Sequence, residues 1–141
     1  MYNRYNDIVF KKDELYSYRG ELKDKNIWIK QSLPLKTDFV YNYYGFRNVY
    51  FKDNSRFFQC YNKEKCILLI IKTKQQAKKM FSLLIRLGDC YAFCAETRKS
   101  FFKIYPKNYE LVIVSSFQPS DLYSGKELKQ IERRFCIVDF K

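Results

Sequence analysis

The chain has 141 residues, of which 47% are apolar, and a formal net charge of +12. This length and apolar content predict one folded domain with a hydrophobic core and argue against disorder. A charge this large attracts polyanions such as nucleic acid or acidic membrane surfaces. The longest apolar run, residues 66–71, is far shorter than the roughly 18 residues of a membrane span. We therefore expect a soluble protein with no membrane partner.

The N-terminus and the cysteines indicate where the protein works. The first residues, which include Asp7, form neither an apolar signal core nor a serine-rich transit peptide, so we expect the protein to work where it is made. Five cysteines, an odd number in a chain of this size, predict a reducing compartment and unpaired, buried thiols. The abundance of Phe, Tyr, Ile, Asn and Lys indicates an A/T-rich genome, which explains part of the aromatic and lysine excess.

The clearest local pattern begins at residue 66. Residues 66–72 form a short, β-branched apolar run, which predicts a strand covered on both faces. Thr73 is the expected N-cap of a following helix, Gln76 its capping-box partner and Gly88 its left-handed stop. Between them, apolar residues recur at helical spacing at Ala77, Met80, Phe81 and Leu84.

Two further strands, a second helix and a last strand are predicted after this helix. Residues 89–96 and a segment centred on residues 111–114 have strand composition, and residues 97–108 would join them as a long hairpin with a basic tip. Residues 119–131 predict a short helix, and residues 134–140 predict the last strand. The order β-α-β-β-α-β predicts an α+β protein with a ferredoxin-like split β-α-β sandwich, in which two helices cover one face of a four-stranded sheet.

Residues 1–60 are predicted to be an aromatic-rich N-terminal extension to a domain of residues 61–141. Residues 26–30 and 39–51 could form strands within this extension. The strand at residues 67–71 does not alternate apolar and polar side chains, so something must cover the second face of the sheet. We therefore expect part of the extension to lie across that face or to add a strand at its edge.

Three motifs follow one another within residues 66–140. Residues 86–88 read Arg-Leu-Gly, residues 111–117 read Leu-Val-Ile-Val-Ser-Ser-Phe, and residues 130–140 end in Ile-Val-Asp-Phe. In this order they resemble the small-subunit ribosomal protein S-ten family, called NusE when it acts in transcription. That family has Arg-Thr-Gly, an apolar strand ending near Ser-Pro-His, and Leu-Val-Asp-Ile at these places. Its proline-rich hairpin tip and its histidines are absent here, so contacts made through them are not carried over.

The resemblance implies a ferredoxin-like fold in the head of the small ribosomal subunit, with no catalysis and a role in translation. Its partners would be small-subunit ribosomal RNA and neighbouring small-subunit proteins, with no small-molecule substrate. Together with the A/T-rich composition and the missing presequence, the resemblance implies a member encoded in a mitochondrial genome. Such a protein would be assembled into the ribosome of the mitochondrial matrix.

The residue inventory argues against an enzyme. The chain has no histidine, which excludes Ser-His and Cys-His nucleophile pairs. Its 4 glycines lie far apart, so a glycine-rich phosphate loop is not expected. The close cysteine pairs, Cys60 with Cys66 and Cys90 with Cys94, do not have the spacing of a zinc knuckle. We expect no cofactor and no metal.

The candidate RNA-binding residues are cations and aromatics in three places. The tip contributes Arg98, Lys99, Phe101, Phe102, Lys103, Tyr105 and Lys107, the first helix contributes Lys72 and Lys74, and the start of the last strand contributes Arg133 and Arg134. Aromatic faces beside phosphate-binding cations are what unpaired RNA bases need for stacking. The tip aromatics could instead anchor a neighbouring protein. For Lys78 and Lys79 a solvated charged face is the favoured interpretation.

Two function hypotheses follow from the sequence. The leading one is a structural RNA-binding protein of the mitochondrial small ribosomal subunit, whose cations neutralise phosphates without reading sequence. The alternative is a small phage or viral protein that inhibits a host nucleic-acid enzyme by occupying its channel or interface. Sedimentation of the native protein with ribosomal subunits would separate them. A sheet-face RNA-recognition domain is disfavoured, because residues 109–114 lack its Gly-aromatic motif.

Overall fold

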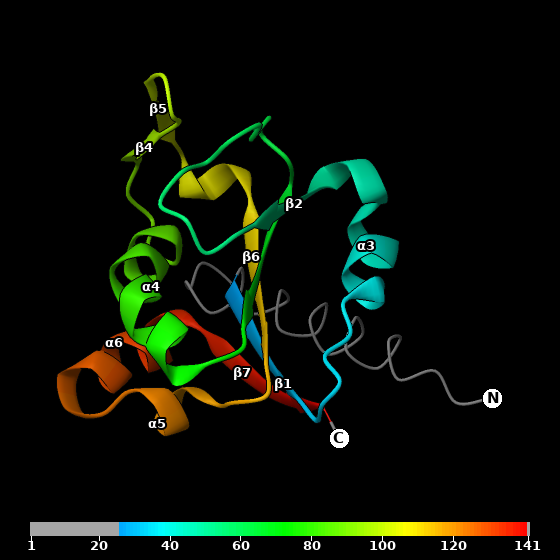
Figure 1. Ribbon diagram of the computed structural model, residues 1–141, viewed down its shortest axis with the longest axis vertical. Helices are drawn as coiled ribbons and strands as arrows, with labels where there is room; N and C mark the ends of the chain where they lie inside the picture. Colours follow the sequence, from blue (N-terminus) through cyan, green and yellow to red (C-terminus); the bar gives the residue numbers. More distant parts are fainter. Residues whose placement is uncertain (1–25, 141) are drawn as a thin grey trace.

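A five-stranded parallel sheet forms the centre of the computed structural model, which describes residues 26–140 (Figure 1). Its strand order is β2-β3-β6-β1-β7, and each of its four strand pairings is parallel. The strands are β1 (Asn26–Gln31), β2 (Val49–Lys52), β3 (Cys66–Ile71), β6 (Glu110–Ser115) and β7 (Cys136–Phe140). A separate antiparallel pair consists of β4 (Phe93–Glu96) and β5 (Phe101–Ile104).

Helices cover both faces of the sheet (Figure 1). One face carries α4 (Lys74–Leu87), α5 (Pro119–Leu122) and α6 (Gly125–Arg134), and the other carries α3 (Asp38–Tyr44). Two short 3-10 turns, η1 (Phe46–Asn48) and η2 (Pro106–Asn108), lie before β2 and β6. The fold is therefore mixed α and β. Parallel strands need crossover connections, which contain helices except between β2 and β3, where residues 53–65 form a loop.

The core is divided by the sheet into two apolar clusters. Ile67 and Leu69 on β3 pack with Trp28 and with buried residues of α4 and α6, whereas Leu68 packs on the other face with Phe39 of α3. Burial of each such side chain stabilises the fold by roughly 1.5–3 kcal/mol. The expectation that β3 is covered on both faces, with cover from residues before 61, is confirmed.

The ferredoxin-like arrangement is not found. That fold requires antiparallel partners for the strands around residues 89–96 and 111–114, but β4 pairs with β5, and β6 lies between β1 and β3 in parallel. The apolar run of β3 has the pattern of a strand buried on both faces, which is typical of parallel sheets. Residues 26–30, which could form a strand, lie in β1, whereas residues 39–51, for which a strand was also possible, form α3, η1 and the start of β2.

Helix α4 follows the sequence pattern closely. The Thr73 hydroxyl accepts a hydrogen bond from the Gln76 backbone N–H at 3.0 Å, and the Gln76 side chain accepts one from the Lys72 N–H at 2.9 Å. The C-terminal end differs from the expectation, because Gly88 has φ −85 rather than a left-handed conformation. A Cβ there would lie 3.0 Å from the Leu84 carbonyl oxygen, so Gly88 permits close packing.

Strand β1 places the N-terminal part of the chain inside the sheet. The Trp28 side chain is fully buried, its Nε1 donates to the Phe117 carbonyl at 2.9 Å, and its ring meets that of Phe135 edge-on at 5.9 Å. Asn26 donates to the carbonyls of Gly88 and Arg134 at 2.7 and 3.0 Å. The division at residue 60 is therefore not a structural boundary, because β1 and β2 belong to the same sheet as the later strands.

Deletion of residues 1–60 should abolish cooperative folding. The fragment of residues 61–141 would lack β1, and β6 and β7 would then be without the strand that pairs with both of them. We expect the fragment to aggregate or to bind a hydrophobic dye strongly, with no cooperative thermal transition, whereas the full chain melts in one transition. A soluble fragment that unfolds cooperatively would contradict this role of β1.

Candidate nucleic-acid interface

The β4–β5 hairpin stands at one end of the molecule, beyond the start of β6 (Figure 1). Its turn is closed by the Thr97 N–H, which donates to the Ser100 carbonyl at 2.8 Å, and it leaves Arg98 and Lys99 exposed at the tip. Along β5 the side chains alternate in the usual two-residue period of a strand. Phe101 and Lys103 point outward, and Phe101 is 71% exposed.

The expected tip of residues 97–108 is only partly a projection. Phe102 lies against the core, with its ring stacked on that of Tyr61 at 6.2 Å, so it is not available as a platform for a base. Residues 106–108 form η2 at the base of β6, where Pro106 is buried. Tyr105 is 46% exposed, and Lys107 lies beside Tyr43 in a separate shallow depression. The projecting part is thus the turn and the outward face of β5.

A loop from the first half of the chain, residues 53–59, lies along this hairpin. The Phe58 N–H donates to the Glu96 carbonyl at 2.9 Å, and the Arg98 N–H donates to the Gln59 side chain at 2.7 Å. Phe57 and Glu96 also form a β-bridge. These contacts place Phe57, Glu96 and Phe101 in one row across three extended segments.

The loop adds cations and an aromatic ring to the hairpin. The guanidinium groups of Arg56 and Arg98 lie 4.8 and 5.0 Å from the centroid of the Phe57 ring. Arg56 also forms an ion pair with Glu96, with 3.1 Å between Nε and Oε1. Arg56 and Phe57 were not predicted as site residues, because they fall in the segment taken for an extension. The Arg-Phe-Phe sequence at residues 56–58 carries the same basic and aromatic signal as the tip.

A buried lysine holds the first turn of the loop. The Lys52 side chain has no exposed surface, and its Nζ donates to the carbonyls of Asp53 and Ser55 and lies 4.9 Å from the Phe58 ring centroid. Burial lowers the pKa of Lys52, and the neighbouring Asp53 carboxylate opposes that effect. The Ser55 hydroxyl donates to Asp53 at 2.7 Å, which lowers the pKa of Asp53. The loop therefore has a fixed local conformation.

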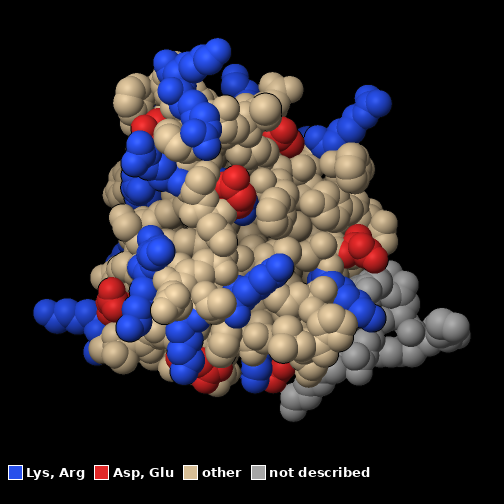
Figure 2. Space-filling model, viewed as in Figure 1, with Lys and Arg blue, Asp and Glu red and all other residues tan. Residues whose placement is uncertain are grey.

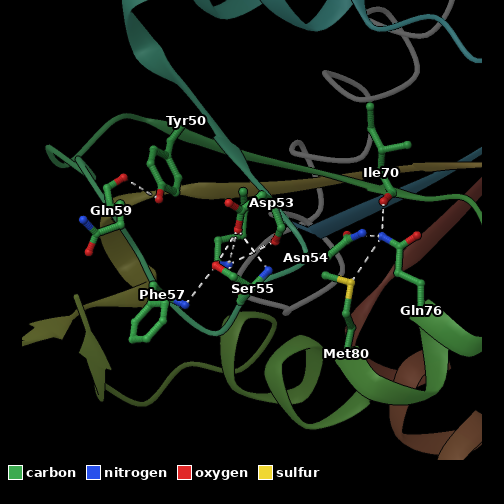
Figure 3. A network of polar contacts seen from close by, with 10 residues as sticks. Tyr50, Asp53, Asn54, Ser55, Phe57, Gln59, Ile70, Gln76 and Met80 are labelled. Carbon is green, nitrogen blue, oxygen red and sulfur yellow. Dashed lines mark hydrogen bonds and ion pairs between the residues drawn. The ribbon is translucent and has the colours of Figure 1, made fainter. Parts of the chain in front are cut away.

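Two further hydrogen bonds tie the loop to its neighbours (Figure 3). The Tyr50 hydroxyl donates to the Gln59 carbonyl at 2.8 Å, and burial raises the pKa of Tyr50 to about 12, so this donor keeps its proton at neutral pH. On the other side, the Gln76 amide on α4 donates to Asn54 and to the Ile70 carbonyl. The loop is thus fixed between β2 and α4, and Phe57 is held in position against the hairpin.

The predicted cations of the first helix lie far from the hairpin. Lys72 and Lys74 are exposed where β3 ends and α4 begins, and the hairpin follows the other end of α4. A helix of 14 residues is about 20 Å long. Figure 2, which has the same view as Figure 1, shows Lys and Arg side chains over the hairpin and along the side of the molecule where α4 lies.

Arg134 is a structural residue, contrary to its prediction as an RNA ligand. It is 4% exposed, and its guanidinium donates to Asp89 at 2.7 Å and to the Gln130 carbonyl at 3.0 Å. Partial burial opposes ionisation of Asp89, but the hydrogen bonds from Arg134 and from the Cys90 backbone N–H, together with the charge of Arg134, outweigh this and lower the pKa of Asp89. Arg133, its neighbour, is exposed.

The C-terminal edge of the sheet carries a second polar region. Parallel α/β sheets bind ligands beyond the C-terminal ends of their strands. Here residues 32–37 connect β1 to α3, and their last two residues are Lys36 and Thr37. The Gln31 side chain closes this loop, because it accepts from the Lys36 N–H at 2.8 Å and donates to the Lys36 carbonyl at 3.0 Å. That N–H is therefore already bonded within the chain.

The cysteines differ from the expectation that all are buried. Cys60, Cys90 and Cys94 are exposed, whereas Cys66 is buried and Cys136 is partly buried. No disulfide joins these five cysteines, all of which lie in the described part of the chain. Within residues 26–140, no three Cys, Asp or Glu side chains lie close enough together to hold a metal ion.

Comparison with known proteins gives no family. No protein-family model matches the chain, and no curated protein matches it. Among the helices of residues 26–140, none is both long and apolar enough to cross a membrane. The chemistry of the interface must therefore be inferred from its own geometry.

Substitution of the two adjacent arginines should change the free energy of unfolding by very different amounts. Arg134→Ala should lower the free energy of unfolding by about 2–3 kcal/mol, because it leaves Asp89 partly buried without its cation, whereas Arg133→Ala should change it by less than about 0.5 kcal/mol. Because Asp89 has a lowered pKa, its stabilising effect is present above the ordinary aspartate pKa and is lost as the pH falls below it. The difference between Arg134→Ala and the unsubstituted protein in urea melts should therefore shrink below pH of about 4. Equal effects of the two substitutions would contradict the structural role.

Proposed function

We propose that the protein binds RNA, without catalysing a reaction, through a hairpin surface formed by the β4–β5 hairpin and the loop of residues 53–59. The residues of this hairpin surface are Arg56, Phe57, Arg98, Lys99, Phe101 and Lys103. The observation that carries the proposal is the placement of two guanidinium groups, from distant parts of the chain, at 4.8 and 5.0 Å from the centroid of the Phe57 ring. Such combinations of rings and cations suit unpaired bases and their phosphates.

The distance between the two aromatic residues of the hairpin surface follows from the row of Phe57, Glu96 and Phe101. Neighbouring strands are about 4.8 Å apart, so the two aromatic residues are separated by about 10 Å. Stacking of a base on an exposed ring such as Phe101 contributes about 1–3 kcal/mol and tolerates any base. The Phe57 ring already has the guanidinium groups of Arg56 and Arg98 over it, so it holds these two cations beside the strand. The cations around the rings would neutralise phosphates, which gives affinity without reading sequence. Glu96 between the rings is already paired with Arg56.

The absence of catalysis is inferred from residue chemistry. The chain has no histidine, so no imidazole can serve as a general base beside the exposed cysteines or serines. The hairpin surface itself consists of arginine, lysine and phenylalanine side chains. These groups bind and position an anionic strand, but they supply no nucleophile paired with a base.

A narrower form of the proposal names small-subunit ribosomal RNA of a mitochondrion as the partner. It rests on the three resembling motifs and on the A/T-rich composition. The parallel sheet does not have the arrangement that the resemblance implies, so the narrower form has no support from the fold. Sedimentation of the native protein with ribosomal subunits is its test, and a protein absent from those fractions would reject it.

The hairpin surface can be tested by the salt dependence of RNA binding. Arg98→Ala combined with Lys99→Ala should weaken binding of a single-stranded oligoribonucleotide and reduce the log–log salt slope by up to about 0.7 for each phosphate that is no longer neutralised. Phe101→Ala should weaken binding by about 1–3 kcal/mol without changing the slope, because stacking releases no counterion.

A charge-matched control distinguishes this surface from general attraction to a basic protein. Lys126→Ala combined with Lys129→Ala removes the same charge from the exposed side of α6. It should leave affinity and slope close to those of the unsubstituted protein. If the two double substitutions change the slope equally, binding is not located at the hairpin surface.

A second candidate function is the binding of a nucleoside triphosphate, and the strand order favours it. From β1 the chain crosses to α3 on one face, and from β6 it crosses to α5 and α6 on the other, so the C-terminal ends of β1 and β6 form a topological switch point. Lys36 and Thr37 match the end of the phosphate-loop pattern G-x-x-x-x-G-K-[ST]. Asp139 lies on the adjacent β7, where a carboxylate could hold Mg²⁺.

Two features weigh against nucleotide binding. Lys30 and Leu35 occupy the positions of the two glycines in that pattern, and Gln31 already bonds the Lys36 N–H. Without glycines the backbone cannot approach the phosphates closely. We therefore expect titration with a fluorescent ATP analogue to show no Mg²⁺-dependent binding. Saturable binding that Lys36→Ala abolishes would instead support the second candidate.

A further inference from the structure

A cavity of about 200 Å³ opens beside the hairpin surface, between α4, the loop of residues 54–58 and β4. Its apolar lining includes Phe58, Met80 and Ala95, each less than 5% exposed. Phe93 adds a second ring, whose centroid lies 6.2 Å from that of Phe58. This α4 pocket therefore offers an apolar, aromatic interior at the edge of a basic surface.

The other lining residues of the α4 pocket give it a positive charge. Arg56, Lys79 and Arg86 line it with a single carboxylate, Glu96, which is ion-paired with Arg56. The Arg86 guanidinium lies 5.7 Å from the Phe93 ring centroid. Within residues 26–140, neither Lys79 nor Arg86 has an ion-pair partner. The excess positive charge would attract an anion whose apolar part can enter the pocket.

The size and polar groups of the pocket limit what can enter it. Pockets for drug-sized ligands have volumes of roughly 300–1,000 Å³, so 200 Å³ suits one small planar ring system. Asn54, Ser55 and Ser82 line the pocket as well and can hydrogen-bond the edge of such a ring. An aromatic lining, polar edge groups and nearby cations correspond to the ring, the edge and the phosphates of a nucleotide.

We propose that the α4 pocket receives the base of one unpaired nucleotide from the RNA strand that the hairpin surface binds. This inference rests on the proposed function and adds the site at which a base leaves the strand. Lys79 and Arg86 contact the phosphates on either side of the inserted nucleotide. Arg56 belongs to both the hairpin surface and the pocket, which makes the two sites continuous.

Two adjacent lysines on α4 differ in their position relative to the pocket. Lys78 and Lys79 are both exposed on α4, but only Lys79 lines the pocket. If α4 presented only a solvated charged face, the two lysines should contribute equally to RNA binding. The proposal instead gives Lys79 a phosphate contact and leaves Lys78 without one, so the pair forms a matched test.

The experiment measures binding of a short single-stranded oligoribonucleotide that carries the fluorescent base 2-aminopurine, over a range of salt concentrations. Ser82→Trp fills the pocket from an exposed position on α4, and Gln75→Trp places the same ring on α4 outside the pocket. Ser82→Trp should lower affinity about five-fold or more, which is the lower end of the contribution of one stacked base, with an unchanged salt slope. It should also remove the part of the 2-aminopurine fluorescence change that comes from the pocket and leave the part that comes from stacking on Phe101, whereas Gln75→Trp should preserve the whole change.

The lysine pair supplies the second arm. Lys79→Ala should reduce the salt slope by up to about 0.7, and Lys78→Ala should leave it unchanged. Equal behaviour of Ser82→Trp and Gln75→Trp, or of Lys79→Ala and Lys78→Ala, overturns the pocket proposal while RNA binding by the hairpin surface stands. Failure of the unsubstituted protein to bind RNA overturns the proposed function itself. Circular dichroism of each variant confirms that it is folded.

Discussion

The pairing of β1 with both β6 and β7 is the interaction on which the rest of the structure depends. It brings the fully buried Trp28 into the cluster shared with α4 and α6, and it places Asn26 where its amide joins the ends of α4 and α6. Because both edges of β1 are hydrogen-bonded, no other strand can take its place without breaking two ladders. The strand therefore holds β6 and β7 in one sheet.

The parallel sheet in turn explains where the hairpin surface lies. A chain that leaves the C-terminal end of a parallel strand must return to the N-terminal edge before the next strand begins. Residues 53–65 make this return between β2 and β3, and α4 makes it between β3 and the hairpin. Both return paths end at the same edge of the sheet. The loop that carries Phe57 and the hairpin that carries Arg98 are thus brought together by topology.

Part of the fold could be predicted from local pattern. The strand at residues 66–71, the helix capped by Thr73 and the strand around residues 111–114 were all found, because each has a strong periodicity or a capping signal of its own. Strand direction could not be predicted in this way, because it is set by long-range pairing. The lack of alternation in β3 is the signal in the sequence for a parallel sheet, but by itself it shows only that both faces of the strand are covered. Residues 39–51 could not be assigned from their composition, because aromatic residues occur both in strands and on short amphipathic helices.

The candidate interface was predictable to a similar degree. The cations of the turn and Phe101 are exposed, as a binding role requires, whereas Phe102 packs against Tyr61 and Arg134 is buried beside Asp89. The sequence could not show the last two features, because burial and the Asp89 partner depend on tertiary packing. Arg56 and Phe57 were missed for the same reason, since their proximity to Arg98 arises only after folding.

The central claim, that RNA lies along the hairpin surface, is tested most directly by ultraviolet cross-linking of the full chain to a single-stranded oligoribonucleotide, followed by mass spectrometry of the adducts. Binding at the hairpin surface predicts adducts on peptides that contain Phe57 and Phe101. Adducts confined to the loop of residues 32–37 or to α6 would contradict it.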